Sequence, residues 1–225
     1  MMSKIPRRPT RLALFLPWAQ YFFLFVGVFA LSYCAFVLID QCSFQADQTR
    51  QFERALDQAQ TSARTDPQST PSALISKEDA DRARFENPPI RVLAGSPLGR
   101  IEIRSIGLKA MIMEGVDGNT LRLAVGHIPG TAIPGEQGNV GLAAHRDTFF
   151  RGLRNIHKGD EIILTTLQGS FRYIVDSTRV VEPDYTRVLA ATTDNLLTLV
   201  TCYPVYFVGP APQRLIVRAH RNPEQ

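Results

Sequence analysis

An uncharged apolar run near the N-terminus, Tyr21 to Ile39, constrains the fold of this chain more than any other feature. Its 19 residues would span about 28 Å as an α-helix, which matches the hydrocarbon core of a bilayer. Residues 12–18 extend the run and add an interfacial aromatic, Trp18, and Asp40 ends it. The pattern predicts a transmembrane anchor over residues 12–40.

Positive charge lies on the N-terminal side of this anchor. Residues 1–11 carry four basic side chains, Lys4, Arg7, Arg8 and Arg11. By the positive-inside rule this segment is cytoplasmic, and the chain after the anchor lies outside the cell membrane as the exported part of a single-pass protein. A cleaved signal peptide is the alternative, but its apolar core is shorter and is followed by a small-residue site that residues 40–43 do not offer.

The charge balance argues against a nucleic-acid partner. The formal net charge is +4, and the four basic residues of the first segment account for it, so the remainder is near neutral. We also expect no metal or cofactor. No histidine and cysteine pattern has zinc spacing, no glycine-rich phosphate loop follows a strand, and Glu182, Asp184 and Asp194 are too scattered for a calcium loop.

Residues 91–225 have the texture of strands and turns. Apolar and β-branched runs predict strands over residues 101–103, 108–113, 139–144, 161–166, 170–181, 196–202 and 214–217. Short helices are expected over residues 119–124, with Asn119 as the cap, and over residues 148–153 and 193–197. Strands at this spacing predict a mainly β domain with a closed or nearly closed barrel.

Three chemically distinct side chains stand at strand ends. Cys202 ends the run that begins at Leu196, Arg214 opens the next run, and His145 follows the strand over residues 139–144. A thiol, an imidazole and a permanent cation are the groups needed to break an amide through a thioester. Cys202 is also the single cysteine of residues 91–225, so a disulfide within this domain is impossible; the other cysteines are Cys34 and Cys42.

The sequence Thr-Leu-Val-Thr-Cys at 198–202, the sequence Ala-His-Arg-Asp at 144–147, and an arginine on the following strand together resemble the sortase family of cysteine transpeptidases, most like class D. The segments Gly126–Thr131 and Cys202–Pro204 add to the resemblance, which covers roughly residues 90–220. The resemblance implies a closed eight-stranded β-barrel.

It also implies an activity. Cys202 would attack an LPXTG-like sorting signal of a secreted protein between Thr and Gly, His145 would move protons, and Arg214 would stabilise the oxyanion. The acyl group would pass to an amine acceptor on the cell envelope, such as a peptidoglycan precursor. If the family geometry holds, His127, Ala143, Val200 and Thr201 line the substrate groove.

Other interpretations stay open at this point. His127 could instead cap a turn, and Val200 could belong to the core. The domain could be a membrane-anchored β-barrel binding module without catalysis, or a thiol protease that only hydrolyses its substrate.

Residues 41–90 are polar and predict a stalk or linker. Phe44, Phe52 and Leu56 could share one side of a helix that runs to about Arg64, and a second short helix is expected from Ser76 to Phe85. We interpret the segment as a solvated spacer. A lid of the kind found in pilin-assembling sortases is the alternative, although residues 66–68 lack the aromatic residue of such lids.

Overall fold

The structure is a computed structural model that describes residues 11–65, 93–207 and 209–222. The chain forms two compact units, Met1–Phe44 and Gln45–Gln225. A single helix, α1 (Arg11–Thr65), runs without interruption through the predicted anchor and beyond Asp40. Most of its large apolar side chains from Trp18 to Ile39 are exposed, as expected for a segment that faces lipid.

Within the described residues, α1 is the one helix long and apolar enough to cross a membrane. The predicted N-terminal apolar helix is therefore confirmed as a helix. The helix expected over Ser76–Phe85, and the possible lid around Asp66, lie outside the described residues.

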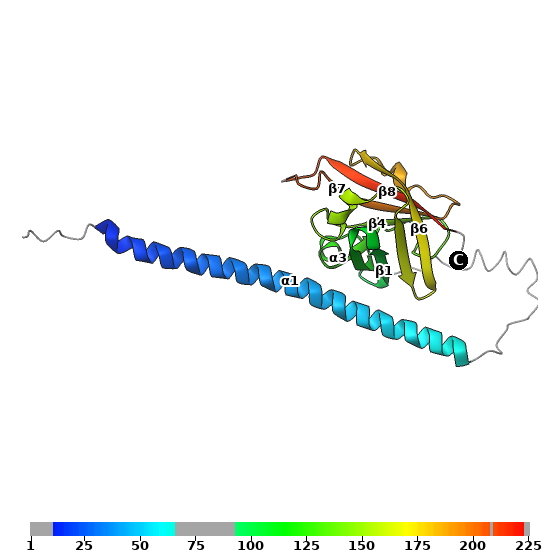
Figure 1. Ribbon diagram of the computed structural model, residues 1–225, viewed down its shortest axis with the longest axis horizontal. Coiled ribbons are helices and arrows are strands. Elements are labelled where there is room, and N and C mark those ends of the chain that lie inside the picture. The colour runs from blue at the N-terminus through cyan, green and yellow to red at the C-terminus, as the bar shows by residue number, and fades with distance from the viewer. Residues whose placement is uncertain (1–10, 66–92, 208, 223–225) are drawn as a thin grey trace, which may run out of the picture. The chain divides into compact units, whose positions relative to one another are not determined.

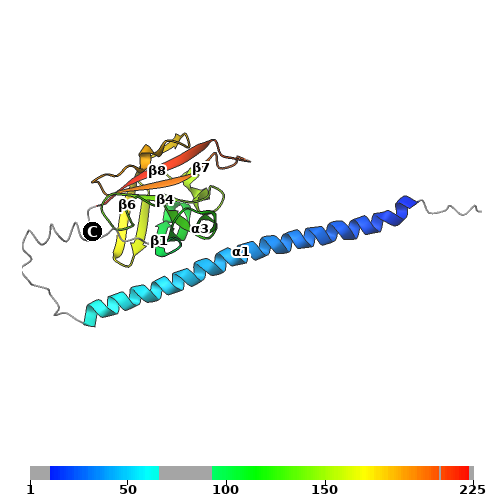
Figure 2. The same ribbon diagram turned by 180° about the vertical axis from the view of Figure 1, so that it is seen from behind.

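The second unit contains a closed eight-stranded barrel, which confirms the predicted fold class. Its strands are β1 (Pro97–Ile103), β2 (Leu108–Glu114), β3 (Val125–His127), β4 (Asn139–Ala143), β5 (Glu161–Thr166), β6 (Gly169–Val181), β7 (Leu196–Tyr203) and β8 (Gln213–Arg221). Their order around the barrel is β1-β2-β3-β4-β7-β8-β6-β5. The pairs β2–β3 and β4–β7 are parallel and the others antiparallel, and both views show β7 beside β8 (Figures 1 and 2).

Alternation of apolar side chains explains why these segments form strands around one core. In β5, Ile162 and Leu164 are fully buried while their neighbours are only half-buried, and Leu197 and Leu199 repeat this spacing in β7. These side chains join a single apolar cluster inside the barrel. Burial raises the pKa of Tyr173, which lies in the same cluster.

The short elements differ from the sequence predictions in three places. Helix α3 (Gly118–Leu123) is capped by Asp117 and not by Asn119, because the Asp117 carboxylate accepts the backbone N–H groups of Asn119 and Thr120. A hydrogen bond from the Thr120 hydroxyl, together with these backbone contacts, lowers the pKa of Asp117. The three-residue strand β3 was not predicted, since it is too short to show periodicity.

The predicted helix over residues 193–197 is wrong. Leu196 is already the first residue of β7, where it pairs with Asn139 of β4, and its backbone N–H donates to the Gly138 carbonyl at 2.9 Å. Strand pairing therefore takes the backbone groups that a helix would have used. The predicted helix over 148–153 is present as the 3-10 segment η2 (Phe149–Asn155).

Two glycines give a matched test of how tightly the barrel is packed. A Cβ atom on Gly126 of β3 would lie 2.3 Å from the Gly115 carbonyl oxygen, whereas one on Gly118 of α3 would meet nothing within 4 Å. Gly126→Ala should therefore lower the free energy of unfolding by about 1–3 kcal/mol or more. Gly118→Ala should leave it unchanged or raise it by up to about 1 kcal/mol.

Denaturant-induced unfolding of the two purified variants measures this difference. Equal stability of the two variants would contradict the close approach of β3 to the segment at Gly115.

Candidate active site

Strand register brings Cys202 and Arg214 together. In the antiparallel β7–β8 pair these two residues are direct partners. Directly opposed residues project to the same side of a sheet, so the thiol and the guanidinium share one face. Leu199 of β7 pairs with Val217 of β8 in the core, and the alternation from these buried residues sends Cys202 and Arg214 to the outer face of the barrel.

His145 reaches the same edge through the neighbouring strand. The parallel pair β4–β7 matches Ala143 with Val200. His145 is two residues beyond Ala143, and Cys202 is two residues beyond Val200. Because the two strands run in parallel, the histidine and the cysteine lie at the same end of the barrel. His145 is exposed and Cys202 is half-buried. Cys202 and Arg214 therefore lie on the adjacent strands β7 and β8, and His145 lies two residues beyond β4, the neighbour of β7 on its other side.

Arg214 is held by the backbone that precedes it. Its Nη1 atom donates to the carbonyl oxygens of Ala211 at 3.1 Å and Gln213 at 2.9 Å. A guanidinium has five N–H donors. Among the described residues, no hydrogen bond is formed by Nε or Nη2 of Arg214.

Ala143 and Val200 form the half-buried surface beside the thiol. They are register partners on the same face as Cys202. The next residue of β7 on this face, Thr198, is fully buried because the 3-10 segment η3 (Thr186–Leu189) covers it. The small side chain of Ala143 and the branched one of Val200 leave room beside Cys202. Contact of these two residues with a substrate stays a prediction.

The cover over Thr198 is fixed by a buried amide. The Thr198 hydroxyl donates to Oδ1 of Asn139 at 2.7 Å, and Nδ2 of Asn139 donates to the carbonyl oxygens of Val188 at 2.9 Å and Ala190 at 3.3 Å. Asn139 is 2% exposed. The Asn139 side chain thus binds both the Thr198 hydroxyl of β7 and two carbonyls of the segment between β6 and β7. These hydrogen bonds hold that segment against the outer face of β4 and β7.

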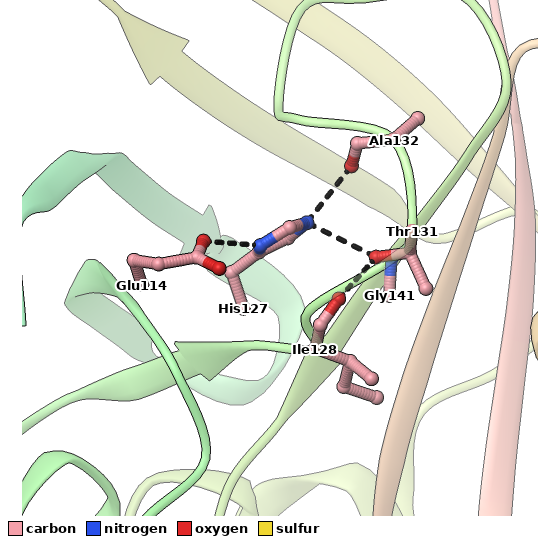
Figure 3. Close-up of polar contacts among 6 residues, drawn as sticks. All are labelled: Glu114, His127, Ile128, Thr131, Ala132 and Gly141. Atoms are coloured by element: carbon pink, nitrogen blue, oxygen red, sulfur yellow. Dashed lines mark hydrogen bonds and ion pairs between the residues drawn. The ribbon is translucent and has the colours of Figure 1, made fainter. Parts of the chain in front are cut away.

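His127 lies at the centre of a buried polar network (Figure 3). Its Nδ1 atom is 2.5 Å from Oε2 of Glu114 at the end of β2, and its Nε2 atom is 3.0 Å from both the Thr131 hydroxyl and the Ala132 carbonyl. The ring is 2% exposed. Both ring nitrogens thus have partners inside the domain, and His127 connects β2 to the segment that follows β3.

Thr131 extends this network to β4. Its hydroxyl donates to the Ile128 carbonyl at 2.7 Å and accepts the backbone N–H of Gly141 at 3.0 Å, as Figure 3 shows. The Ile128 N–H in turn donates to the Gly141 carbonyl at 2.8 Å. Because β3 has only three residues, these contacts continue the β3–β4 pairing beyond the strand and fix the strand that leads to His145.

Thr201 supports the same region from β7. It is 2% exposed, and its hydroxyl donates to the Ala144 carbonyl at 2.8 Å. The contact joins the residue before Cys202 to the residue before His145. The side chain of Thr201 therefore faces the barrel interior, and the predicted contact with substrate would have to come from its backbone.

Sequence reasoning missed Glu114, Thr131 and Asn139. Glu114 and Asn139 stand at strand ends and are nearly buried, which is unusual for polar residues, but burial cannot be seen in one sequence. Thr131 belongs to the Gly126–Thr131 segment that the family resemblance had singled out as a whole. For metals, no group of three or more histidine, cysteine or acidic ligands occurs in the described part of the chain.

A model of the sortase domain matches residues 101–222, the span that contains all eight strands apart from the start of β1. The chain belongs to the sortase family. This sortase is 30% identical to Sortase D of Bacillus subtilis over 201 residues, which is 89% of this chain and 96% of the relative. The predicted resemblance to class D is thereby confirmed, and the chain is a cysteine transpeptidase of this family.

Solved structures agree with the barrel of this sortase. The Sortase D5 transpeptidase of Clostridium perfringens has a TM-score of 0.59 and 27% identity, with 80% of this chain and 99% of that one covered. Sortase C from Clostridium perfringens SM101 has a TM-score of 0.58 and 28% identity, with 80% and 98% covered.

A pair of acidic residues tests the importance of the buried network. Glu114→Ala removes the acceptor of the buried His127 ring and should lower the free energy of unfolding by about 1–3 kcal/mol. Glu102 makes a surface ion pair with Arg104 at 3.0 Å, so Glu102→Ala should cost at most about 1 kcal/mol. Thermal and denaturant unfolding at pH 7 compare the two. Similar losses would mean that the His127 network contributes nothing beyond a surface contact.

Proposed function

We propose that this sortase cleaves an LPXTG-like sorting signal between Thr and Gly through a thioester on Cys202, and transfers the acyl group to an amine on the cell envelope. The observation that carries the proposal is the β7–β8 register, in which Cys202 and Arg214 are direct partners, with His145 two residues beyond the adjacent strand β4. Family membership supplies the reaction class, and the residues supply the roles.

The first step forms the thioester. The sulfur of Cys202, as a thiolate, adds to the Thr carbonyl carbon and produces a tetrahedral oxyanion. Collapse breaks the bond to the Gly nitrogen, and protonated His145 gives its proton to this departing amine. The products are a Thr thioester on Cys202 and a free peptide that begins with Gly.

The second step reverses the roles. An incoming amine attacks the thioester carbonyl while His145 removes its proton, and collapse of the second tetrahedral state returns the thiolate. Arg214 would stabilise both oxyanions through Nε and Nη2, because Nη1 is already used by the backbone carbonyls of Ala211 and Gln213. Water in place of the amine would give hydrolysis instead of transfer.

The outer face of β7 and β8 offers a path for an extended peptide. Because η3 covers the outer face of β7 at Thr198, the path beyond Val200 would run over β8, where a pocket of about 90 Å³ is lined by Val188, Ile216 and Arg218 together with Ser177 and Arg179. This pocket lies at the level of Thr198, four residues from Cys202 along β7, or about 13 Å at the rise of a strand. An extended sorting signal bound at Cys202 is long enough to reach it.

The exposed apolar part of α1 supports an anchored enzyme. We infer a single-pass membrane protein with a cytoplasmic N-terminus and an extracytoplasmic barrel, because basic residues precede the apolar run. Its protein substrates would then be secreted chains with a C-terminal sorting signal, and the acceptor would be a peptidoglycan precursor or a similar envelope amine.

Substitution of the reactive groups tests the mechanism. Cys202→Ala should abolish cleavage of an LPXTG peptide and the formation of the amine adduct, and Arg214→Ala should lower kcat by roughly 10²–10³-fold through loss of oxyanion stabilisation. Mass spectrometry of peptide, hydrolysis product and adduct provides the measurement. Cys42→Ser is the matched control, because Cys42 is an exposed cysteine of α1, and it should retain full activity.

Full cleavage by Cys202→Ala would refute the thioester mechanism. Hydrolysis without any adduct at high amine concentration would identify a thiol protease, and stable peptide binding without either product would favour a binding module.

Cysteine accessibility tests the topology. In cells that express a variant with Cys34→Ala and Cys42→Ser, a membrane-impermeant maleimide should label Cys202 without permeabilisation. A reporter introduced as Ser3→Cys, with the other cysteines replaced, should be labelled only after the membrane is opened. The reverse pattern would place the barrel in the cytoplasm and exclude exported substrates.

A further inference from the structure

The connection between β7 and β8 is tied to the segment that carries His145. This connection begins at Pro204, directly after β7, and ends at Pro212, directly before β8. Arg146, the neighbour of His145, donates from Nη1 to the Pro204 carbonyl at 3.1 Å and from Nη2 to the Gly209 carbonyl at 2.8 Å. One guanidinium therefore bridges two backbone carbonyls that are five residues apart in the connection.

A second arginine reaches the same connection. The guanidinium carbon of Arg154, in η2, lies 4.9 Å from the ring centroid of Tyr206, which is within the range of a cation–π contact. Arg146 and Arg154 belong to the stretch that follows β4, and both contact the stretch that joins Cys202 to Arg214. We call Arg146, Arg154 and Tyr206 the clasp.

The far end of the connection holds Arg214. As described above, Nη1 of Arg214 donates to the carbonyls of Ala211 and Gln213. The orientation of the guanidinium thus depends on where the connection places these two oxygens. Arg146 fixes the beginning and middle of the connection, and the connection fixes Arg214.

We propose that Arg146 and Arg154 are positioning residues that fasten the β7–β8 connection to the His145 segment, and so hold Arg214 in the orientation that serves Cys202. The inference rests on the proposed function, since it assigns Arg214 to the reacting carbonyl. It adds that the relative position of histidine, cysteine and arginine is set by the clasp as well as by strand register.

The chemistry of the clasp explains the choice of residues. A guanidinium is planar and presents two separate Nη donors at a fixed spacing, so it can hold two carbonyls at once. A lysine ammonium is a single point donor on a flexible stem and cannot reproduce the bridge. The contacts are part-buried or exposed and lie outside the apolar core, so their loss should affect alignment more than folding.

Steady-state kinetics of the full-length purified enzyme test the proposal, with an LPXTG peptide and an amine acceptor. Arg146→Ala should lower kcat by roughly 10- to 100-fold with little change in KM, because a small misplacement of Arg214 penalises the transition state. Arg146→Lys should not rescue the rate. Arg151→Ala is the matched control: Arg151 is an exposed arginine of η2 that does not belong to the clasp, and its variant should behave as the parent enzyme.

Tyr206 gives a conservative pair. Tyr206→Phe keeps an aromatic face for Arg154 and should retain kcat, whereas Tyr206→Ala should lower it. The thermal midpoint should stay the same in all variants, and the rate of Cys202 alkylation by iodoacetamide should stay near that of the parent, because the clasp acts through Arg214 and not through the thiol.

A double-mutant cycle distinguishes positioning from independent effects. If Arg146 acts through Arg214, the Arg146→Ala substitution should have no further effect in an Arg214→Ala background. Multiplicative losses, a parent-like kcat for Arg146→Ala, or a fall in thermal midpoint that parallels the fall in kcat would each overturn the proposal. Failure of the proposed function gives a different result. In that case Cys202→Ala would keep full activity, whether or not the clasp residues are also substituted.

Discussion

Two strand pairings, β4 with β7 and β7 with β8, determine where the proposed catalytic residues of this sortase lie. Leu197, Leu199 and Val217 are fully buried, and their burial selects the register. A slip of one residue would turn Cys202 toward the interior and expose the leucines, which is prohibitively costly in a barrel with one apolar core. The position of the thiol is therefore a consequence of core packing, and no separate interaction is needed to aim it.

Strand pairing alone does not reach His145, to which we assign the proton transfers. β3 has three residues, and β4 ends two residues before His145. Buried polar contacts supply the missing constraint: Thr131, which also contacts His127, holds β4 at Gly141, and the Thr201 hydroxyl holds Ala144. Such contacts are effective because an unsatisfied polar group inside the barrel would be costly.

The sequence predicted the barrel, the apolar helix and the strand positions of Cys202, His145 and Arg214, because apolar periodicity and strand ends are local features. The inward direction of Thr201 could also be predicted, because Thr201 is two residues from Leu199 and therefore lies on the same side of the strand. The contacts of Arg146 could not be predicted from the sequence. Its two partners are backbone carbonyls about sixty residues away, and any residue has such a carbonyl. The cap at Asp117 was misassigned because Asn119 is an equally good cap by residue type.

Closure of the barrel has a consequence for molecular recognition. Each strand has a neighbour on both sides, so the barrel leaves a polypeptide ligand only short stretches of unpaired strand edge, such as residues 177–181 of β6 on the side away from β8. Side chains on the outer surface and the segments that join the strands are therefore the main sources of selectivity. Related enzymes could thus acquire new preferences by altering those joining segments, while the hydrophobic interior and the strand register of Cys202 and Arg214 stay as they are.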